Sequence, residues 1–445
     1  LSSGRLICSC VIMPAMGILD TLPRPSDQRL ALRVTPEAQR ALRQGHPWLF
    51  DRAIVSQNMA GRPGDLAVVF DDRRRFLAIG LYDPASPIRV RVLQHGAPAI
   101  IDASFFAGRL AAAAARRAPL LGDGEGVRLV AGPTGGDTTG YRLVHGEGDG
   151  LPGLVIDRYD QVLALKLYSA AWLPHLRAVL AGLAEVAPAD AVVLRLSRAV
   201  QRESAALHGL IDGMTLAGEL AANPVVFREN GLRFEADVLH GQKTGFFLDQ
   251  RENRARVEGL AAGKETLNVF AYTGGFSLYA ARGGAPAILS LDISAPALAA
   301  AGRNFDLNRH LSPVTAARHE LLVEDAFSAL ARLARDGRRF DLVIVDPPAF
   351  AKQQSEIPAA LRSYERLAGL ALGVLRPGGT LVMASCSSRV GAEDFVATVR
   401  RGAARAGLAL HEFDHTGHPV DHPVGFAEGA YLKCLYAHVD IMRNS

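Results

Sequence analysis

Between residues 266 and 385 the chain alternates short apolar runs with longer segments of helical length. Five of these runs have the length and composition of buried strands: 266–272, 287–293, 319–325, 340–346 and 380–385. Regular alternation of strands and helices predicts a doubly wound, largely parallel sheet. In such sheets ligands bind outside the carboxyl ends of the strands. We therefore expect an α/β domain over residues 241–445, with its site at those ends.

The first part of the chain has a different pattern, with five shorter strands separated by turn residues: 30–36, 46–55, 65–71, 76–83 and 88–94. Short strands at this spacing predict a small β-barrel over residues 29–101.

Residues 102–240 mix the two patterns and predict a central α+β domain. Helices are expected at 105–117 and 173–185, and Gly146 to Gly153 joins two strand-like runs. This glycine-rich stretch lacks the Lys-Ser/Thr and helix of a phosphate loop, so we interpret it as a hairpin turn. Residues 1–28 look unlike the rest, and we expect them to be a disordered or non-native extension, with Met13 or Met16 as the true start.

Composition narrows the class of protein. The 445 residues include only four cysteines, and the net charge is +4. So few cysteines do not form a disulfide framework, which favours a reducing, cytoplasmic location. No apolar run approaches the roughly 18 residues of a membrane span, so we expect no membrane partner.

Positive charge is concentrated near the N-terminus. Residues 29–95 contain eleven arginines and six acidic residues, and one turn holds Arg73, Arg74 and Arg75. Arginine makes bidentate contacts with phosphate, so we expect these three residues to bind RNA. A solvated surface is about as consistent with the charges alone.

Acidic residues follow three successive strands of the predicted parallel sheet. Asp292, Asp325 and Asp346 stand at these strand ends, and Thr273-Gly274 follows the first strand. Asp292 lies 18 residues beyond Gly274. An acid at about this spacing after a glycine loop can accept hydrogen bonds from ribose hydroxyls. A single such acid is more often a helix cap, but three beside a glycine loop favour an adenosine ligand. S-adenosylmethionine suits this acidic setting better than a dinucleotide, since no pyrophosphate-binding glycine motif is present.

These segments together resemble the class I S-adenosylmethionine-dependent methyltransferases, and most closely the bacterial large-subunit ribosomal RNA cytosine-C5 methyltransferases. The matching segments are RQGHPWLFDRAI (43–54), SPIRVRVL (86–93), GEGDGLPGLVIDRYD (146–160), QKTGFFLDQRENR (242–254), LNVFAYTGGFSLYA (267–280), LDIS (291–294), VDPPAF (345–350), SCSS (385–388) and YLKC (431–434). The resemblance implies a PUA-like RNA-binding barrel, a central domain and a Rossmann-like methyltransferase domain.

The resemblance also implies roles for individual residues. Asp292 would hold the cofactor's ribose, Asp325 its adenine, and Asp346 would lie beside the transferable methyl group and the target base. The other implied cofactor contacts are Phe270, Tyr272, Thr273 and Gly274. The implied substrate contacts are Lys243, Phe247, Asp249, Arg251, Pro347, Pro348 and Phe350. Asp249 with Glu252 also fits a capping box for a following helix.

Cys386 lies where the strand 380–385 should emerge from the sheet. C-5 of cytosine is a poor nucleophile, and addition of a thiolate at C-6 activates it, which requires a covalent nucleophile. We therefore predict Cys386 as the nucleophile, with Asp346 at the ring N-3 side. The alternative is a small half-buried residue, a common fate of free cysteine. The DPPAFAKQ segment lacks a second cysteine, so the base that removes the C-5 proton is not identified.

Three further points stay open at this level. Four histidines at 411–422 could bind zinc, but two prolines and the lack of cysteine partners favour a site-covering loop and no metal. Methylation of another rRNA base atom, such as a guanine nitrogen, needs no thiol. An RNA-binding assembly factor without turnover is the third reading. We expect large-subunit ribosomal RNA as the partner and leave a homodimer open.

Overall fold

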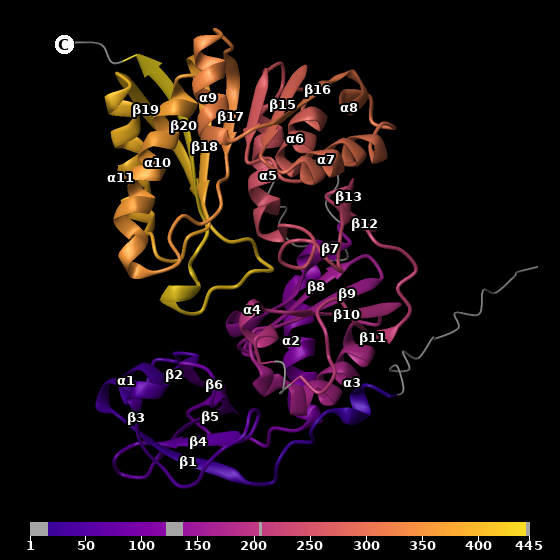
Figure 1. The fold of residues 1–445 in the computed structure, drawn as a ribbon, viewed down its shortest axis with the longest axis vertical. Helices are drawn as coiled ribbons and strands as arrows, with labels where there is room; N and C mark the ends of the chain where they lie inside the picture. The colour runs from indigo at the N-terminus through magenta and orange to yellow at the C-terminus, as the bar shows by residue number, and fades with distance from the viewer. Residues whose placement is uncertain (1–16, 122–136, 204–206, 442–445) are drawn as a thin grey trace, which may run out of the picture.

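The computed structural model describes residues 17–121, 137–203 and 207–441, which form three sheets and a hairpin (Figure 1). The N-terminal sheet has the strand order β2-β6-β5-β4-β1-β3. Its strands are β1 (Arg29–Val34), β2 (Trp48–Phe50), β3 (Ile54–Gln57), β4 (Leu66–Phe70), β5 (Phe76–Tyr82) and β6 (Ile88–His95). The expected second strand is in fact two strands, because a 3-10 turn at Asp51–Ala53 divides it and sends its halves to opposite edges of the sheet. Helix α1 (Pro36–Arg43) is capped by Thr35.

The central part contains a five-stranded sheet of order β11-β10-β9-β8-β7. Its strands are β7 (Gly140–His145), β8 (Leu154–Tyr159), β9 (Val162–Leu167), β10 (Ala191–Leu196) and β11 (Thr215–Gly218), and its helices are α2 (Ala103–Leu121), α3 (Leu176–Val186) and α4 (Arg198–Gln201). Strands β7 and β8 pair antiparallel across the glycine-rich stretch, which confirms the predicted hairpin.

The C-terminal sheet has seven strands in the order β16-β15-β14-β17-β18-β20-β19. Strands β14 to β18 are parallel, and β20 runs antiparallel to both of its neighbours. The strands are β14 (Thr266–Val269), β15 (Ala287–Asp292), β16 (Arg318–Val323), β17 (Phe340–Val345), β18 (Leu375–Ser385), β19 (Leu408–Thr416) and β20 (Lys433–Ile441). All five predicted strands are present, and the strand order changes direction at β14, as in a doubly wound sheet.

Helices cover both faces of this sheet, as Figure 1 shows. They are α5 (Arg251–Leu260), α6 (Gly275–Arg282), α7 (Ala295–Leu307), α8 (Ser312–Ala316), α9 (Ala326–Arg335), α10 (Ile357–Leu372) and α11 (Ala392–Arg405). A hairpin of β12 (Val225–Glu229) and β13 (Leu232–Ala236) precedes α5. Within the described residues no helix is long and apolar enough to cross a membrane.

The apolar core is continuous between the central and C-terminal parts. Tyr159 of the central sheet packs in one cluster with Phe227 and Phe234 of the hairpin and Phe246 and Tyr279 of the C-terminal part. The two parts on either side of residue 240, where the sequence pattern changes, therefore share one core.

The expected extension at the N-terminus needs a correction. Residues 1–16 lie outside the described residues, but Leu19 and Leu22 are buried in the core of the central part. Arg177 donates to the backbone oxygen of Leu22. Their apolar side chains explain why this short segment packs against the fold.

A long segment between β19 and β20, residues 417–432, leaves the sheet and reaches towards the N-terminal part (Figure 1). Phe426 packs edge-on against Trp48, with ring centroids 4.9 Å apart. The backbone oxygen of Asp421 accepts a hydrogen bond from Arg117 of the central part. This segment therefore links all three parts of the chain.

Candidate active site

A cavity of about 440 Å³ lies at the carboxyl ends of β14, β15, β17 and β18. This is where the doubly wound sheet predicts a ligand site. Its lining combines the glycine loop, the QKTGFFLDQ segment, the Asp-Pro-Pro segment and the cysteine: Gln242, Lys243, Phe246, Phe247, Asp249, Gln250, Arg254, Phe270, Ala271, Tyr272, Thr273, Gly275, Phe276, Asp292, Ile293, Ser294, Asp346, Pro347, Pro348, Ala349, Cys386 and Leu432.

The loop between β14 and α6 has unusual backbone geometry. Phe270, Tyr272 and Gly274 have φ angles of +61°, +48° and +74°. Positive φ is rare for residues other than glycine and clusters at functional sites, where surrounding contacts hold it. Here Asp292 supplies such contacts: its Oδ2 accepts from Tyr272 N and its Oδ1 from Ser294 N, both at 2.8 Å. Asp292 therefore fixes the loop around one side of the cavity.

The residues on this side fit an adenosine-containing cofactor. Thr273 Oγ1 is buried, lines the cavity and has no hydrogen-bond partner among the described residues. Ile293 is 74% exposed although it is a large apolar residue, and it also lines the cavity. An unpaired buried hydroxyl and an exposed apolar face are both costly without a ligand. Together with the Asp292 carboxylate they offer polar and apolar contacts to a nucleoside.

The opposite side holds the predicted nucleophile. Because β17 and β18 are parallel neighbours, their carboxyl ends bring the Asp-Pro-Pro segment against Cys386, whose Sγ lies 3.9 Å from Pro347 O. Burial and the nearby Asp249 carboxylate raise the pKa of Asp346 to about 7. Burial and the nearby Asp346 raise the pKa of the Cys386 thiol to about 11. The free thiol and a carboxyl that titrates near neutrality thus share one cavity.

Lys243 and Asp249 of the cavity wall form a connected polar group with Tyr431. Lys243 Nζ and the Tyr431 hydroxyl both donate to Asp249 Oδ2, at 2.6 and 2.8 Å. Lys243 also lies 4.4 Å from the centroid of the Phe247 ring, a cation–π distance. Burial alone would raise the pKa of Asp249, but the Lys243 ammonium, together with His422 and Arg142, outweighs burial and holds that pKa well below its usual range.

Two predictions for this segment are wrong. Asp249 does not form a capping box, since its carboxylate faces Lys243 and Tyr431 and the start of α5 has no side-chain cap. Arg251 does not present a free guanidinium to RNA: it is 2% exposed and donates to both carboxylate oxygens of Asp421 at 2.8 and 2.9 Å. Both departures arise from contacts with the distant 417–432 segment.

The remaining predicted residues fall into two groups. Pro347 and Pro348 line the cavity, whereas Phe350 packs against Tyr364 with ring centroids 4.9 Å apart and is not part of the lining. Asp325 also lies outside the lining. Its Oδ2 accepts from Ser328 N and Oγ, so it caps α9, and its contact with adenine stays a prediction.

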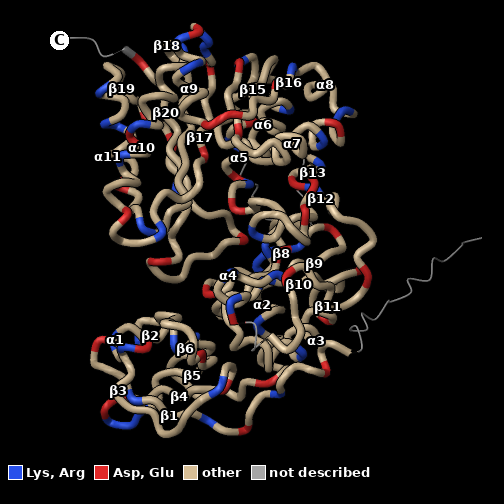
Figure 2. Tube along the Cα trace, in the orientation of Figure 1, with Lys and Arg blue, Asp and Glu red and all other residues tan. Residues whose placement is uncertain are grey.

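Arg73, Arg74 and Arg75 form the exposed turn between β4 and β5. Arg75 Nε donates to the buried Asp71 at 2.8 Å, and Asp71 Oδ1 also accepts from Arg73 N and Arg75 N. The turn is therefore held in a defined shape with its side chains outside. Figure 2 shows basic and acidic positions interspersed over all three parts of the chain.

Several residues around the site were not singled out from the sequence. Tyr431 holds Asp249, and Lys433 Nζ donates to Ser387 O and Val390 O, each at 2.5 Å. Lys433 thus ties down the backbone that follows Cys386. Both residues belong to YLKC, whose match to the family was the available signal. Their partners lie far away in sequence: Lys433 begins β20, which pairs antiparallel with β18, and Tyr431 just before it reaches Asp249.

Of the four histidines in the histidine-rich stretch, His411 and His415 lie in β19, and His418 and His422 lie in the 417–432 segment. His422 Nδ1 lies 3.0 Å from Asp421 Oδ1, and His418 Nε2 accepts from Leu432 N at 3.2 Å. Within the part of the chain that the structure describes, no group of three metal-ligating side chains is placed to hold an ion.

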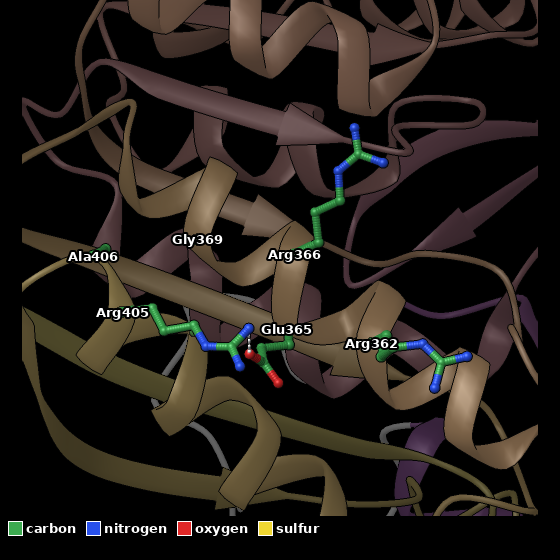
Figure 3. Close-up of a pocket in the computed structure, with 7 residues that line it drawn as sticks. Arg362, Glu365, Arg366, Gly369, Arg405 and Ala406 are labelled. Carbon is green, nitrogen blue, oxygen red and sulfur yellow. Dashed lines mark ion pairs between the residues drawn. The ribbon is translucent and has the colours of Figure 1, made fainter.

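A second cavity, of about 470 Å³, lies between α10 and α11 (Figure 3). Glu365 is paired there with Arg405, and Gly402 lets the two helices approach closely. This groove is lined by none of the candidate catalytic or binding residues predicted from the sequence. The strand-end cavity is therefore the candidate active site.

Comparison with known proteins agrees with this geometry. A family model described as S-adenosylmethionine-dependent methyltransferase matches residues 141–437, and a PUA-like domain model matches residues 32–95. The chain belongs to the S-adenosylmethionine-dependent methyltransferase family. The cofactor and the N-terminal PUA-like domain predicted from the sequence are thereby confirmed.

Relatives of nearly equal length carry related names. A ribosomal RNA large subunit methyltransferase of Deinococcus radiodurans is 52% identical over 94% of this chain and 99% of its own length. A ribosomal RNA large subunit methyltransferase I of Shewanella amazonensis is 38% identical over 92% of this chain and 99% of its own. These matches confirm the family resemblance, although none of the names specifies a base.

Solved structures support the fold. A chain described as a SAM-dependent methyltransferase from Streptococcus mutans superposes with a TM-score of 0.75 at 23% identity, covering 92% of this chain and 99% of that one. A second methyltransferase, solved as a complex with SAH, gives a TM-score of 0.74 at 23% identity.

Proposed function

We propose that this protein methylates C-5 of a cytosine in large-subunit ribosomal RNA, with Cys386 as covalent nucleophile. The observation that carries the proposal is the placement of the free thiol of Cys386 beside the Asp-Pro-Pro segment, in the cavity that also fits the cofactor. The names of the full-length relatives support ribosomal RNA as the substrate class, and such a substrate would place its action in the cytoplasm.

The cofactor side of the cavity has defined tasks. S-adenosylmethionine, when bound, supplies an electrophilic methyl group. Asp292 would accept hydrogen bonds from its ribose, Ile293 would pack against its base, and the loop of Phe270, Tyr272 and Gly274 would surround its methionine part. Methylation of a nitrogen would need only these groups and a correctly positioned target nucleobase, whereas methylation of C-5 also needs a thiol.

The thiol and the carboxyl act together in the covalent step. The Cys386 sulfur forms a bond to C-6 of the ring, and the electron pair of the C5–C6 double bond becomes available at C-5. The thiol proton must leave as the bond forms, and N-3 of the ring must gain a proton. Asp346, with a pKa near 7, can accept the first and donate the second, so that no net charge accumulates in the buried cavity. C-5 would then form its bond to the methyl group, and the cofactor would leave as S-adenosylhomocysteine. Loss of the C-5 proton, cleavage of the S–C6 bond and return of the N-3 proton to the departing Cys386 sulfur through Asp346 then restore the aromatic ring.

Binding of the RNA would be shared along the chain. We propose that the exposed arginine turn at 73–75 contacts phosphates, while Lys243, Phe247 and the two prolines contact the target nucleotide. Bases that undergo chemistry are unstacked and enter such pockets between aromatic and apolar side chains.

Product analysis tests the assignment. Deproteinised large-subunit rRNA would be incubated with the protein and labelled cofactor, digested to nucleosides and separated. We expect labelled 5-methylcytidine from the wild type and none from Cys386→Ala. Label on a guanine nitrogen, with full activity in Cys386→Ala, would replace the proposal by nitrogen methylation. No label from any rRNA would favour a binding factor without turnover.

A further inference from the structure

Asp249 has one carboxylate oxygen that the protein itself leaves unused. The side chain is 3% exposed and lines the active-site cavity. Its Oδ2 accepts two hydrogen bonds, from Lys243 and Tyr431, while its Oδ1 is buried and has no donor within reach among the described residues. A buried ionised oxygen without a partner is costly. Oδ1 is therefore matched to a hydrogen-bond donor on a ligand.

The neighbours of Asp249 show which ligand its free oxygen faces. Cys386 and Asp346 line the same cavity, so Asp249 belongs to the wall around the target base rather than to a separate site. Asp249 is also the charged group that, after burial, contributes most to raising the pKa of Asp346. Near neutral pH the cavity therefore presents Asp249 as a carboxylate beside Asp346, which carries a proton in a large fraction of the molecules.

These two states match one base edge. An ionised carboxylate only accepts hydrogen bonds, whereas a protonated carboxyl can donate one. The Watson–Crick edge of cytosine offers a 4-amino donor beside the N-3 acceptor. Uracil offers the reverse, an O-4 acceptor beside an N-3 donor. Asp249 as acceptor and Asp346 as donor are complementary to cytosine and mismatched to uracil.

We propose that Asp249 selects cytosine over uracil by accepting a hydrogen bond from the 4-amino group of the target base through Oδ1. The inference rests on the proposed C-5 methylation of cytosine and deepens it. Lys243 and Tyr431 position the carboxylate, because their bonds to Oδ2 direct Oδ1 towards the base. A site built to hydrogen-bond a ligand group rejects analogues that lack it far more strongly than apolar packing does.

Asp249→Asn tests the inference through a change of preference. If the amide oxygen of the new side chain faces Lys243 and Tyr431, its NH₂ group occupies the Oδ1 position. That group repels the 4-amino group of cytosine and can donate to O-4 of uracil. The assay uses the full-length protein and rRNA fragments with cytosine or uracil at the methylated position, and measures kcat/KM for C-5 methylation of each.

We expect the wild type to prefer cytosine by at least about a thousandfold. We expect the cytosine-to-uracil ratio in Asp249→Asn to fall by about a hundredfold or more, the effect of losing one charged contact and adding a mismatched one. Since the ratio is taken within one variant, the fraction of folded enzyme cancels. Tyr431→Phe is the matched control: it removes one of the two bonds to Oδ2, but Lys243 still holds the carboxylate and Oδ1 stays an acceptor, so its rates fall while cytosine remains strongly preferred.

The outcomes separate this inference from the proposed function. If the wild type forms no C-5 product on cytosine, both are contradicted. If it does, and Asp249→Asn lowers both rates with an unchanged ratio, Asp249 is only structural and this inference alone fails.

If Asp249→Asn does not fold, binding by the Cys386→Ala variant decides instead. RNA with 2-pyrimidinone, which lacks the 4-amino group, should bind that variant about tenfold or more weakly than cytosine RNA. Equal binding would overturn the inference.

Discussion

Replacing Asp292 with alanine should weaken cofactor binding through two effects. The carboxylate now accepts from Tyr272 N and Ser294 N, each at 2.8 Å, and it faces the cavity where the cofactor's ribose would lie. The substitution removes the acceptor for the ribose hydroxyls. It also releases the loop whose residues Phe270 and Tyr272 have positive φ angles.

The magnitude follows from the type of bond. A hydrogen bond to a charged group contributes about 1.5–3 kcal/mol, which corresponds to roughly ten- to a hundredfold in affinity. Part of this cost belongs to the free protein, because a loop without its carboxylate samples other conformations and must be ordered again on binding.

Calorimetric titration with S-adenosylhomocysteine measures the effect without turnover. Asp325→Ala is the comparison, since Asp325 also follows a strand of the parallel sheet but caps α9. If its carboxylate only caps, that variant should bind the product within about threefold of the wild type and lose about 0.5–2 kcal/mol of stability. Unchanged affinity in Asp292→Ala would refute the reasoning, and a large loss in Asp325→Ala would restore its predicted contact with adenine.

Two further perturbations probe the rest of the chain. Replacing the three arginines at 73–75 with alanine should weaken rRNA binding. If each contacts a phosphate, the slope of the logarithm of the binding constant against the logarithm of salt concentration should become shallower by up to about three. Titrations at several salt concentrations measure this slope, and an unchanged slope would mean that the turn is ordinary surface. Arg251→Met should lower the free energy of unfolding by about 3–5 kcal/mol, because it leaves the buried Asp421 carboxylate without its cation. Denaturant unfolding measures this loss, and a loss below about 1 kcal/mol would contradict the prediction.

The sequence predicted what local patterns determine. Apolar runs of strand length predict β14 to β18 along the chain, and acidic residues stand at the ends of these runs. Asp292 and Asp346 are therefore predicted at the ligand site without any tertiary information. The loop of Phe270 to Gly274 was located in the same way.

Other features depend on contacts across large sequence separations. Asp249 looked like a helix cap because Glu252 follows it at capping-box spacing, but Tyr431, 182 positions later, occupies its Oδ2 instead. Arg251 was expected to contact RNA because of the family resemblance, yet Asp421 of the 417–432 segment accepts the hydrogen bonds of its guanidinium. Leu19 and Leu22 were set aside with an atypical leader, although their apolar side chains find a place in the central core. No local pattern encodes such partners.

The covalent role of Cys386 is tested most directly by trapping. rRNA with 5-fluorocytosine at the target position allows addition of the thiol at C-6 and methyl transfer, but fluorine at C-5 prevents the proton loss that releases the enzyme. With S-adenosylmethionine present, the wild type should form an RNA–protein adduct that survives denaturing electrophoresis, with the linkage mapped to Cys386 by mass spectrometry, and Cys386→Ala should form none. An adduct at another residue, or methylated product from Cys386→Ala at the wild-type rate, would contradict the account.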